Sequence, residues 1–218
     1  MGVMRRIWQA IDGFGNACYR GFRALRQPLT GPVCRVLVRL HINQSHVSLL
    51  RIAVLAGFLL LWLAGQYYVA IAALAVYFFL DMVDGDLARL LKTESDLGKF
   101  EDSMGDGVMV VVLPLALIGQ GLVTGLLGAY YVFMATLSWW LSAIRRNIGK
   151  GSDWLFHPEA SGLLHFTRFW VMTILVILYV LAGIDIFGTA MLALATVFTL
   201  SAAYDYYQLT RERLAGRR

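Results

Sequence analysis

Four aspartates fall at regular spacings on either side of one short polar stretch of the sequence. Asp81 and Asp84 lie three residues apart, and Asp102 and Asp106 lie four apart, so each pair shares one face if its segment is helical. Carboxylates gathered at one place repel each other unless cations lie among them. Their hard oxygen atoms suit Mg²⁺ or Mn²⁺, and two such ions can hold a diphosphate. The spacing therefore predicts a two-metal site for phosphate chemistry.

The residues between the two pairs fit a nucleotide. Gly85 and Gly98 leave room for a ligand close to the backbone, and Arg89 can form charge-assisted hydrogen bonds to phosphate. The alternative is a salt-bridged cap, but four acids against one nearby arginine favour the metal interpretation. Asp86 and Glu101 are expected to point away from the two acidic faces, toward solvent or lipid headgroups.

The elements that must carry these residues follow from the composition. Of the 218 residues, 59% are hydrophobic and 15% are charged, whereas soluble domains have about 45–50% and about 25%. This composition excludes a disordered chain and disfavours a water-soluble globule. Six apolar runs are long enough to cross a hydrocarbon core of roughly 30 Å. We expect an all-α integral membrane protein with a six-transmembrane-helix bundle, over residues 47–64, 68–90, 99–118, 122–144, 164–182 and 186–206.

The segment before the first run is amphipathic. Between residues 7 and 25, apolar side chains recur at steps of three and four, and arginines lie among them. This pattern is typical of a helix lying in the interface of an anionic membrane surface. Pro28, Gly31 and Pro32 are expected to interrupt the helix.

The distribution of basic residues predicts the topology. The short linkers at 65–67, 119–121 and 183–185 contain no Lys or Arg. The positive-inside rule therefore places the acidic site and both termini in the cytoplasm. We expect the membrane to be a bacterial inner membrane. We divide the chain into a cytoplasmic amphipathic segment, 1–46, and a transmembrane catalytic domain with a short basic tail, 47–218. The net charge of +5 fits loops facing anionic lipid, and we expect no nucleic-acid partner.

Eight residues in and around the acidic pairs match a family signature. They read Asp81-x-x-Asp84-Gly85-x-x-Ala88-Arg89, then eight residues, then Gly98-x-x-x-Asp102-x-x-x-Asp106. This pattern resembles the complete signature of the CDP-alcohol phosphotransferases, which move a substituted phosphate from a CDP-linked donor to a hydroxyl and release CMP. The six-span layout with an N-terminal interfacial helix is also similar to that family.

The resemblance implies roles for individual residues. The four aspartates would hold two Mg²⁺ or Mn²⁺ ions, and Asp106 would also be the catalytic general base. Ser48 replaces a threonine that many members carry before the first span, while Ser45 stands where they carry an asparagine. The resemblance also implies a homodimer. The expected nucleotide-binding residues are Gly85, Ala88, Arg89, Gly98 and Ser48.

Basic residues near the fourth and fifth spans are candidates for acceptor binding. They are Arg145, Arg146, Lys150 and Arg168. Arg168 lies within an apolar run, where a guanidinium needs an anionic partner, and the phosphate of an acceptor would supply one. Ordinary positive-inside flanking is an equal alternative for Arg145 and Lys150.

We therefore predict a membrane transferase that moves the phosphatidyl group of CDP-diacylglycerol to a polar alcohol, preferably a phosphorylated polyol such as glycerol phosphate or inositol phosphate. One alternative keeps the fold but uses CDP-choline or CDP-ethanolamine as donor and diacylglycerol as acceptor. Another has an uncharged or zwitterionic acceptor: inositol, serine or choline. A third alternative is a small cation transporter, which would have no need for the glycines and arginine of the nucleotide site.

Overall fold

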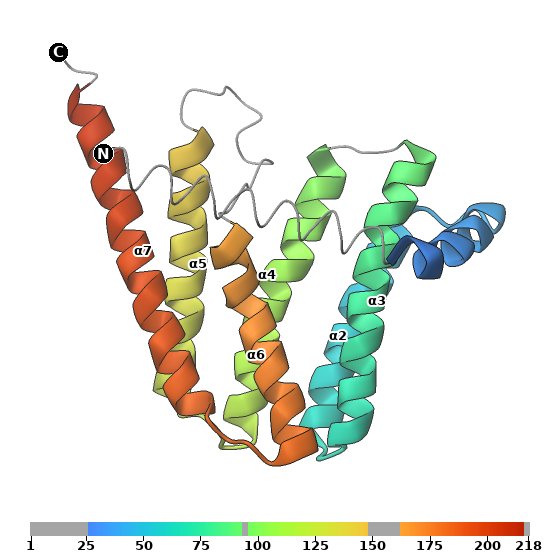
Figure 1. Ribbon diagram of the computed structural model, residues 1–218, viewed down its shortest axis with the longest axis horizontal. Coiled ribbons are helices and arrows are strands. Elements are labelled where there is room, and N and C mark those ends of the chain that lie inside the picture. The colour runs from blue at the N-terminus through green and yellow to red at the C-terminus, as the bar shows by residue number, and fades with distance from the viewer. Residues whose placement is uncertain (1–25, 93–95, 148–161, 216–218) are drawn as a thin grey trace.

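The computed structural model describes residues 26–92, 96–147 and 162–215. Within these ranges, the side chains at 96–104, 106, 143, 145–147, 162–169 and 212–215 are outside the description. The described part of the chain is all-helical and contains no strand (Figure 1).

Six long helices lie at the ranges predicted from the apolar runs. They are α2 (Gln44–Leu63), α3 (Tyr67–Leu91), α4 (Asp96–Gly119), α5 (Gly125–Asn147), α6 (Gly162–Ala182) and α7 (Phe187–Ala215). Three described stretches are long and apolar enough to cross a membrane: Gln44–Leu63, Tyr67–Leu91 and Phe187–Arg211. Shorter apolar helical stretches cover Gly107–Gly119 and Trp170–Ala182. The all-helical architecture is thus confirmed, and the count of six spans stays a prediction.

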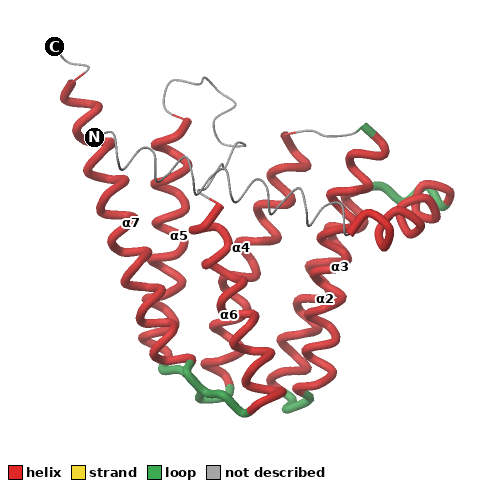
Figure 2. Tube along the Cα trace, viewed as in Figure 1, coloured by secondary structure: helices red, strands yellow, loops and turns green. Residues whose placement is uncertain are grey.

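Three tight connections gather at one end of the bundle (Figure 2). Each contains a glycine in the left-handed region, with φ of 75° at Gly65, 70° at Gly121 and 68° at Gly183. The amide of Gln120 donates to the carbonyl oxygens of Trp62 and Leu63, at 2.9 and 3.1 Å, and so ties two of the connections together. The opposite end of the bundle carries the aspartates of α3.

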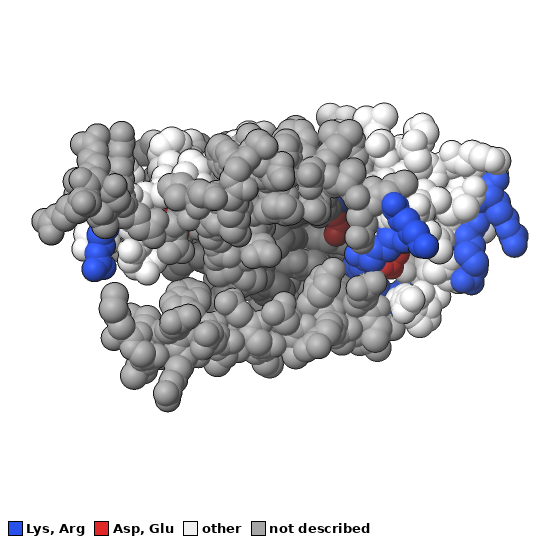
Figure 3. All heavy atoms as spheres, turned by 90° about the horizontal axis from the view of Figure 1, so that it is seen from above, with Lys and Arg blue, Asp and Glu red and all other residues white. Residues whose placement is uncertain are grey.

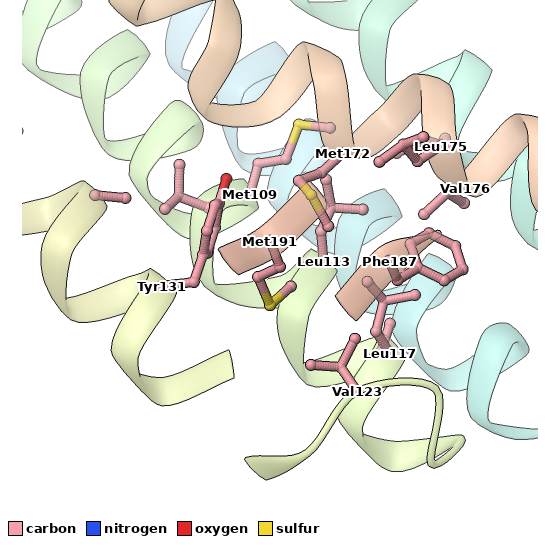
Figure 4. Close-up of a cluster of buried hydrophobic side chains, with 14 of the residues drawn as sticks. Met109, Leu113, Leu117, Val123, Tyr131, Met172, Leu175, Val176, Phe187 and Met191 are labelled. Atoms are coloured by element: carbon pink, nitrogen blue, oxygen red, sulfur yellow. The ribbon is translucent and has the colours of Figure 1, made fainter. Parts of the chain in front are cut away.

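The hydrophobic core lies between the helices of this bundle. In Figure 4, Met109 and Leu113 of α4 lie beside Met172 of α6 and Met191 of α7. The rings of Phe78 and Trp170 stack with centroids 4.5 Å apart and join α3 to α6. Helix α4 contacts α2, α5 and α6, so it connects the two halves of the molecule.

The predicted interruption at Pro28, Gly31 and Pro32 is wrong. Residues 26–39 form one helical segment, here called the N-terminal helix, which passes through all three positions. A proline inside a helix removes one backbone donor, but tertiary packing supplies most helix stability. Buried Cys34 provides such packing, in a cluster with residues of α2 and α3. The amphipathic stretch at 7–25 lies outside the described residues.

Candidate active site

Two polar contacts join α2 to α3 at the end of the bundle opposite the tight connections. Ser48 Oγ donates to Asp84 Oδ2 at 2.5 Å, and Arg51 Nη1 donates to a carboxylate oxygen of Asp81. The partners are three residues apart on both helices, so the contacts form successive rungs between antiparallel neighbours. Asp81 and Asp84 both face α2, in agreement with the common face that their spacing predicted.

Arg51 is fully buried at the junction of three helices. Its guanidinium carbon lies 5.6 Å from the centroid of the Tyr77 ring. Tyr77 Oη donates to the carbonyl oxygen of Gly105 at 3.1 Å, and a methyl group at Gly105 would overlap the guanidinium of Arg51. A buried arginine requires an anionic partner, and Asp81 provides one. Arg51 was not predicted as a site residue, although it is a lone arginine in an apolar run, which is the signal that singled out Arg168.

The second acidic pair lies on α4. Asp102 is three residues before Gly105 and Asp106 is the next residue, but both side chains are outside the described part of the chain. Because Gly105 contacts Arg51, the structure brings the backbone that carries this pair beside the α2–α3 contacts. Among the side chains that are described, no three His, Cys, Asp or Glu residues come together. A cluster of four carboxylates therefore stays a prediction.

The chemistry of the described donors fits a divalent cation. Asp81 and Asp84 present carboxylate oxygens from adjacent turns of α3, and the Ser48 hydroxyl lies against one of them. Hard oxygen donors of this kind are the ligands that Mg²⁺ and Mn²⁺ prefer. The Asp81 carboxylate is also paired with Arg51, a contact of the kind that the salt-bridged alternative predicts.

The predicted nucleotide residues of α3 lie in its last two turns. Ala88 is buried, and the side chain of Arg89 folds back over Gly85. A Cβ atom at Gly85 would lie 3.3 Å from Arg89 Nη2, so glycine permits this close approach. Gly98 lies in the first turn of α4.

The expectation that Asp86 is simply solvated is wrong. Its carboxylate accepts hydrogen bonds from Arg26 and Thr30 of the N-terminal helix and from Arg89 of its own helix. Its side chain is only 15% exposed. Two helices meet at this carboxylate, which a period-based assignment of faces does not reveal. The side chain of Glu101, for which the same was expected, lies outside the description.

The candidate acceptor residues are not brought to a described site. Arg145 and Arg146 lie in the last turn of α5 and Arg168 lies near the start of α6, with their side chains outside the description. Lys150 lies outside the described residues altogether. Their predicted role is untested by these contacts.

A buried polar contact between α5 and α7 was not predicted from the sequence. Ser142 Oγ of α5 donates to Asp205 Oδ2 of α7 at 2.5 Å, and both side chains are buried. Asp205 is an acidic residue inside the predicted span 186–206, and this unusual position was the signal that could have indicated a buried partner. The contact joins α5 to α7 away from the α2–α3 rungs (Figure 1).

Figure 3 shows the polar end of the molecule, where described acidic and basic side chains lie side by side over the half that contains α2 and α3, while further Lys and Arg side chains lie apart from them at both edges of the view. This arrangement agrees with the ion pairs of Asp81 with Arg51 and of Asp86 with Arg26 and Arg89. Opposite charges thus lie together at the end that carries the signature residues.

The fold and these contacts define a helical, membrane-type protein with an acidic site at one end of its bundle. The family model of CDP-alcohol phosphatidyltransferase matches residues 45–201, and the chain belongs to this family. Its members are membrane-associated transferases of substituted phosphate groups that act in phospholipid biosynthesis. They use a CDP-alcohol donor and an alcohol acceptor and generally depend on divalent metal ions. A search of curated proteins finds no match to the chain.

The family assignment decides between two of the predicted classes. A transferase requires the residues around the acidic pairs, whereas a cation transporter does not. The transporter alternative is therefore set aside, and the enzyme class is confirmed.

Proposed function

We propose that this enzyme transfers the phosphatidyl group of CDP-diacylglycerol to a phosphorylated polyol, such as glycerol phosphate or inositol phosphate, and releases CMP. The observation that supports the transfer site is the pair of contacts from Ser48 and Arg51 to Asp84 and Asp81, beside Gly105 of α4. The choice of a phosphorylated acceptor rests on the basic residues of the sequence, above all Arg168 within an apolar run. These contacts lie within the segment that matches the family.

The four aspartates at 81, 84, 102 and 106 would hold two Mg²⁺ or Mn²⁺ ions. When bound, the ions neutralise charge and polarise the phosphoryl oxygens of the donor. Four carboxylates balance two divalent cations, so buried Arg51 leaves one positive charge in excess. An excess positive charge favours an anionic diphosphate in this site.

The reaction needs one proton acceptor. In the proposed step, Asp106 takes the proton of the acceptor hydroxyl, whose oxygen forms a bond to the phosphorus that carries diacylglycerol. The bond from this phosphorus to the bridging oxygen breaks, and CMP leaves with the electron pair. The proton then passes from Asp106 to solvent, so that the carboxylate is restored for another cycle.

The donor nucleotide is assigned to the end of α3 and its neighbours. Gly85, Ala88 and Gly98 would allow it to approach the backbone, and Arg89 would form charge-assisted hydrogen bonds to the diphosphate. The Ser48 hydroxyl, 2.5 Å from Asp84 Oδ2, lies at the α2 side of the same region.

The proposed setting is a bacterial inner membrane with six spans in the catalytic domain, residues 47–218. Both termini and the acidic site face the cytoplasm, and the segment 1–46 lies at the membrane interface. The proposed assembly is a homodimer, by resemblance to the family.

A competition among acceptors tests the proposed substrate. The purified enzyme receives CDP-diacylglycerol, Mg²⁺ and an equimolar mixture of glycerol phosphate, inositol phosphate, inositol, serine and choline. Mass spectrometry of the lipid products identifies the acceptor that reacts. We expect a phosphorylated polyol in the product. A product from serine, inositol or choline, or a reaction only of CDP-choline with diacylglycerol, would contradict the proposal.

The variant Arg168→Gln tests the acceptor site. A charge-assisted bond to a desolvated anion contributes roughly 1.5–3 kcal/mol, so the KM for the acceptor should rise by roughly ten- to a hundredfold. The KM for CDP-diacylglycerol should stay nearly constant. The matched control is Arg211→Gln, an exposed arginine on α7. A selective rise in the KM of the donor would show that Arg168 does not bind the acceptor.

Cysteine labelling tests the proposed orientation. In a variant without Cys18 and Cys34, single cysteines at Gln66 and Gln120 should react with an impermeant maleimide added outside spheroplasts. A cysteine at Ser95 should react only after the membrane is opened. External labelling at position 95 would invert the orientation and place the active site outside the cytoplasm.

A further inference from the structure

Three donors from two helices meet at the carboxylate of Asp86. Thr30 Oγ1 and Arg26 Nη2 of the N-terminal helix lie 2.5 Å and 3.1 Å from its oxygens, and Arg89 Nη2 of α3 lies 2.6 Å away. Thr30 is fully buried. A carboxylate with three donors, two of them charged, is held in one orientation. Asp86 itself is not one of the family signature positions.

Arg89 is held by this carboxylate beside the proposed donor site. Its side chain is 25% exposed and turns back over Gly85, where a Cβ atom would lie 3.3 Å from Nη2. A guanidinium has five N–H donors, and its contact with Asp86 engages Nη2. Other donors can therefore reach a ligand. Fixing a long side chain in advance reduces the conformational entropy lost on binding.

The N-terminal helix is held by the same carboxylate. Its second attachment is apolar: Cys34 is buried with Val83 and Leu87, and Cys34 Sγ donates to the carbonyl oxygen of Val83 at 3.7 Å. Figure 1 shows this helix beginning beside the upper part of α3 and extending away from the bundle. The docking of the N-terminal helix and the position of Arg89 thus both depend on Asp86.

We propose that Asp86 is a positioning residue of the donor site, which holds Arg89 ready for the diphosphate while the N-terminal helix is docked on α3. This inference deepens the proposed function and rests on it, because it takes Arg89 as a ligand of the donor. Two arginines around one carboxylate also leave a positive excess, which suits an anionic donor.

The variant Asp86→Asn tests the effect on the donor. It keeps the shape of the side chain but removes the charge that holds Arg89 and Arg26. The KM for CDP-diacylglycerol should rise about tenfold, which corresponds to the loss of one charge-assisted hydrogen bond. The KM for the acceptor and kcat should change less than about threefold. Thr30→Val, a milder change, should raise the donor KM by roughly two- to fourfold.

A matched control and a double variant separate positioning from general structure. Arg39→Gln removes an exposed arginine from the same helix and should leave the donor KM unchanged, whereas Arg26→Gln should raise it. If Asp86 acts through Arg89, the effect of Asp86→Asn should largely disappear in an Arg89→Lys background. Equal effects in both backgrounds would overturn the inference.

The reactivity of Cys34 reports on the docking without any measurement of activity. Burial and the nearby Asp86 carboxylate raise the pKa of the Cys34 thiol, so it reacts slowly with maleimide while the helix is docked. In a Cys18→Ser background, Arg26→Gln should speed this labelling at least about fivefold, although loss of its positive charge alone would raise the pKa of the Cys34 thiol and slow the reaction. Asp86→Asn should also speed labelling, partly because it lowers this pKa directly, and Arg39→Gln should not.

These readouts distinguish the possible failures. Faster labelling with an unchanged or lower donor KM would overturn the inference and leave the proposed function standing, and so would unchanged labelling. Absence of CMP release by the unmodified enzyme with every acceptor would overturn the proposed function and the inference together. Faster labelling with a selective rise in the donor KM supports both.

Discussion

Replacement of Asp84 by Asn is expected to lower CMP release by roughly a thousandfold, the upper range for loss of one group that stabilises charge in a transition state. Asp84 is buried, and its Oδ2 accepts a hydrogen bond from Ser48 Oγ at 2.5 Å. The amide has almost the same shape, so the bundle should fold, while one negative charge disappears from the proposed metal site. The measurement is the initial rate of CMP formation under saturating Mg²⁺.

The matched control is Asp185→Asn. Asp185 lies in the loop at the opposite end of the bundle, where its carboxylate accepts the backbone N–H of Phe187 at 3.4 Å, and the amide oxygen can keep that contact. We expect CMP release within about twofold of the unmodified enzyme. An Asp84→Asn variant that is folded and retains more than a tenth of the activity would contradict the assignment of Asp84 to the site.

Gly105→Ala is expected to reduce kcat/KM by about a hundredfold, the cost of a small misplacement in an active site. The added methyl group would overlap the guanidinium of Arg51, which is fully buried and paired with Asp81. The guanidinium must move, and the acidic face of α3 then loses its fixed partner. Steady-state kinetics with varied donor and acceptor measure this loss.

Gly107→Ala on the same helix provides the control. Its methyl group would lie 3.9 Å from the Trp139 ring, which is an ordinary contact. Helix propensity alone favours alanine over glycine by about 1 kcal/mol at either position. Gly107→Ala should therefore be at least as stable as the parent, whereas the overlap with Arg51 should cancel this gain in Gly105→Ala. Similar activity in the two variants would show that the position of Arg51 beside Asp81 is not needed for activity.

Apolar runs and glycine-containing linkers were enough to predict where the long helices lie. The predicted ends of the first two spans lie within a few residues of the ends of α2 and α3. An apolar segment of about 20 residues has few stable structures other than a helix in a membrane. The three-residue spacing of Asp81 and Asp84 also predicted their common face. These features depend on the local sequence and on helix geometry.

Contacts between helices were harder to predict, because periodicity along one helix does not identify its neighbours. Arg51 and Gly105 lie far apart in the sequence and meet only where α2 crosses α4. Asp86 was expected to face solvent or lipid headgroups, yet the N-terminal helix covers it with Arg26 and Thr30. Both errors come from tertiary packing that overrides local preference.

The most direct test of the central claim is a stoichiometric assay of the purified enzyme in lipid nanodiscs. CDP-diacylglycerol and a polar alcohol are supplied with Mg²⁺, and CMP and new phospholipid are quantified together, with and without excess EDTA. We predict one CMP for each new phospholipid, no CMP without an acceptor, loss of both products in EDTA and recovery with Mg²⁺ or Mn²⁺. CMP release that persists in excess chelator, or formation of CMP without a new phospholipid, would contradict a metal-dependent phosphatidyl transfer at the acidic site.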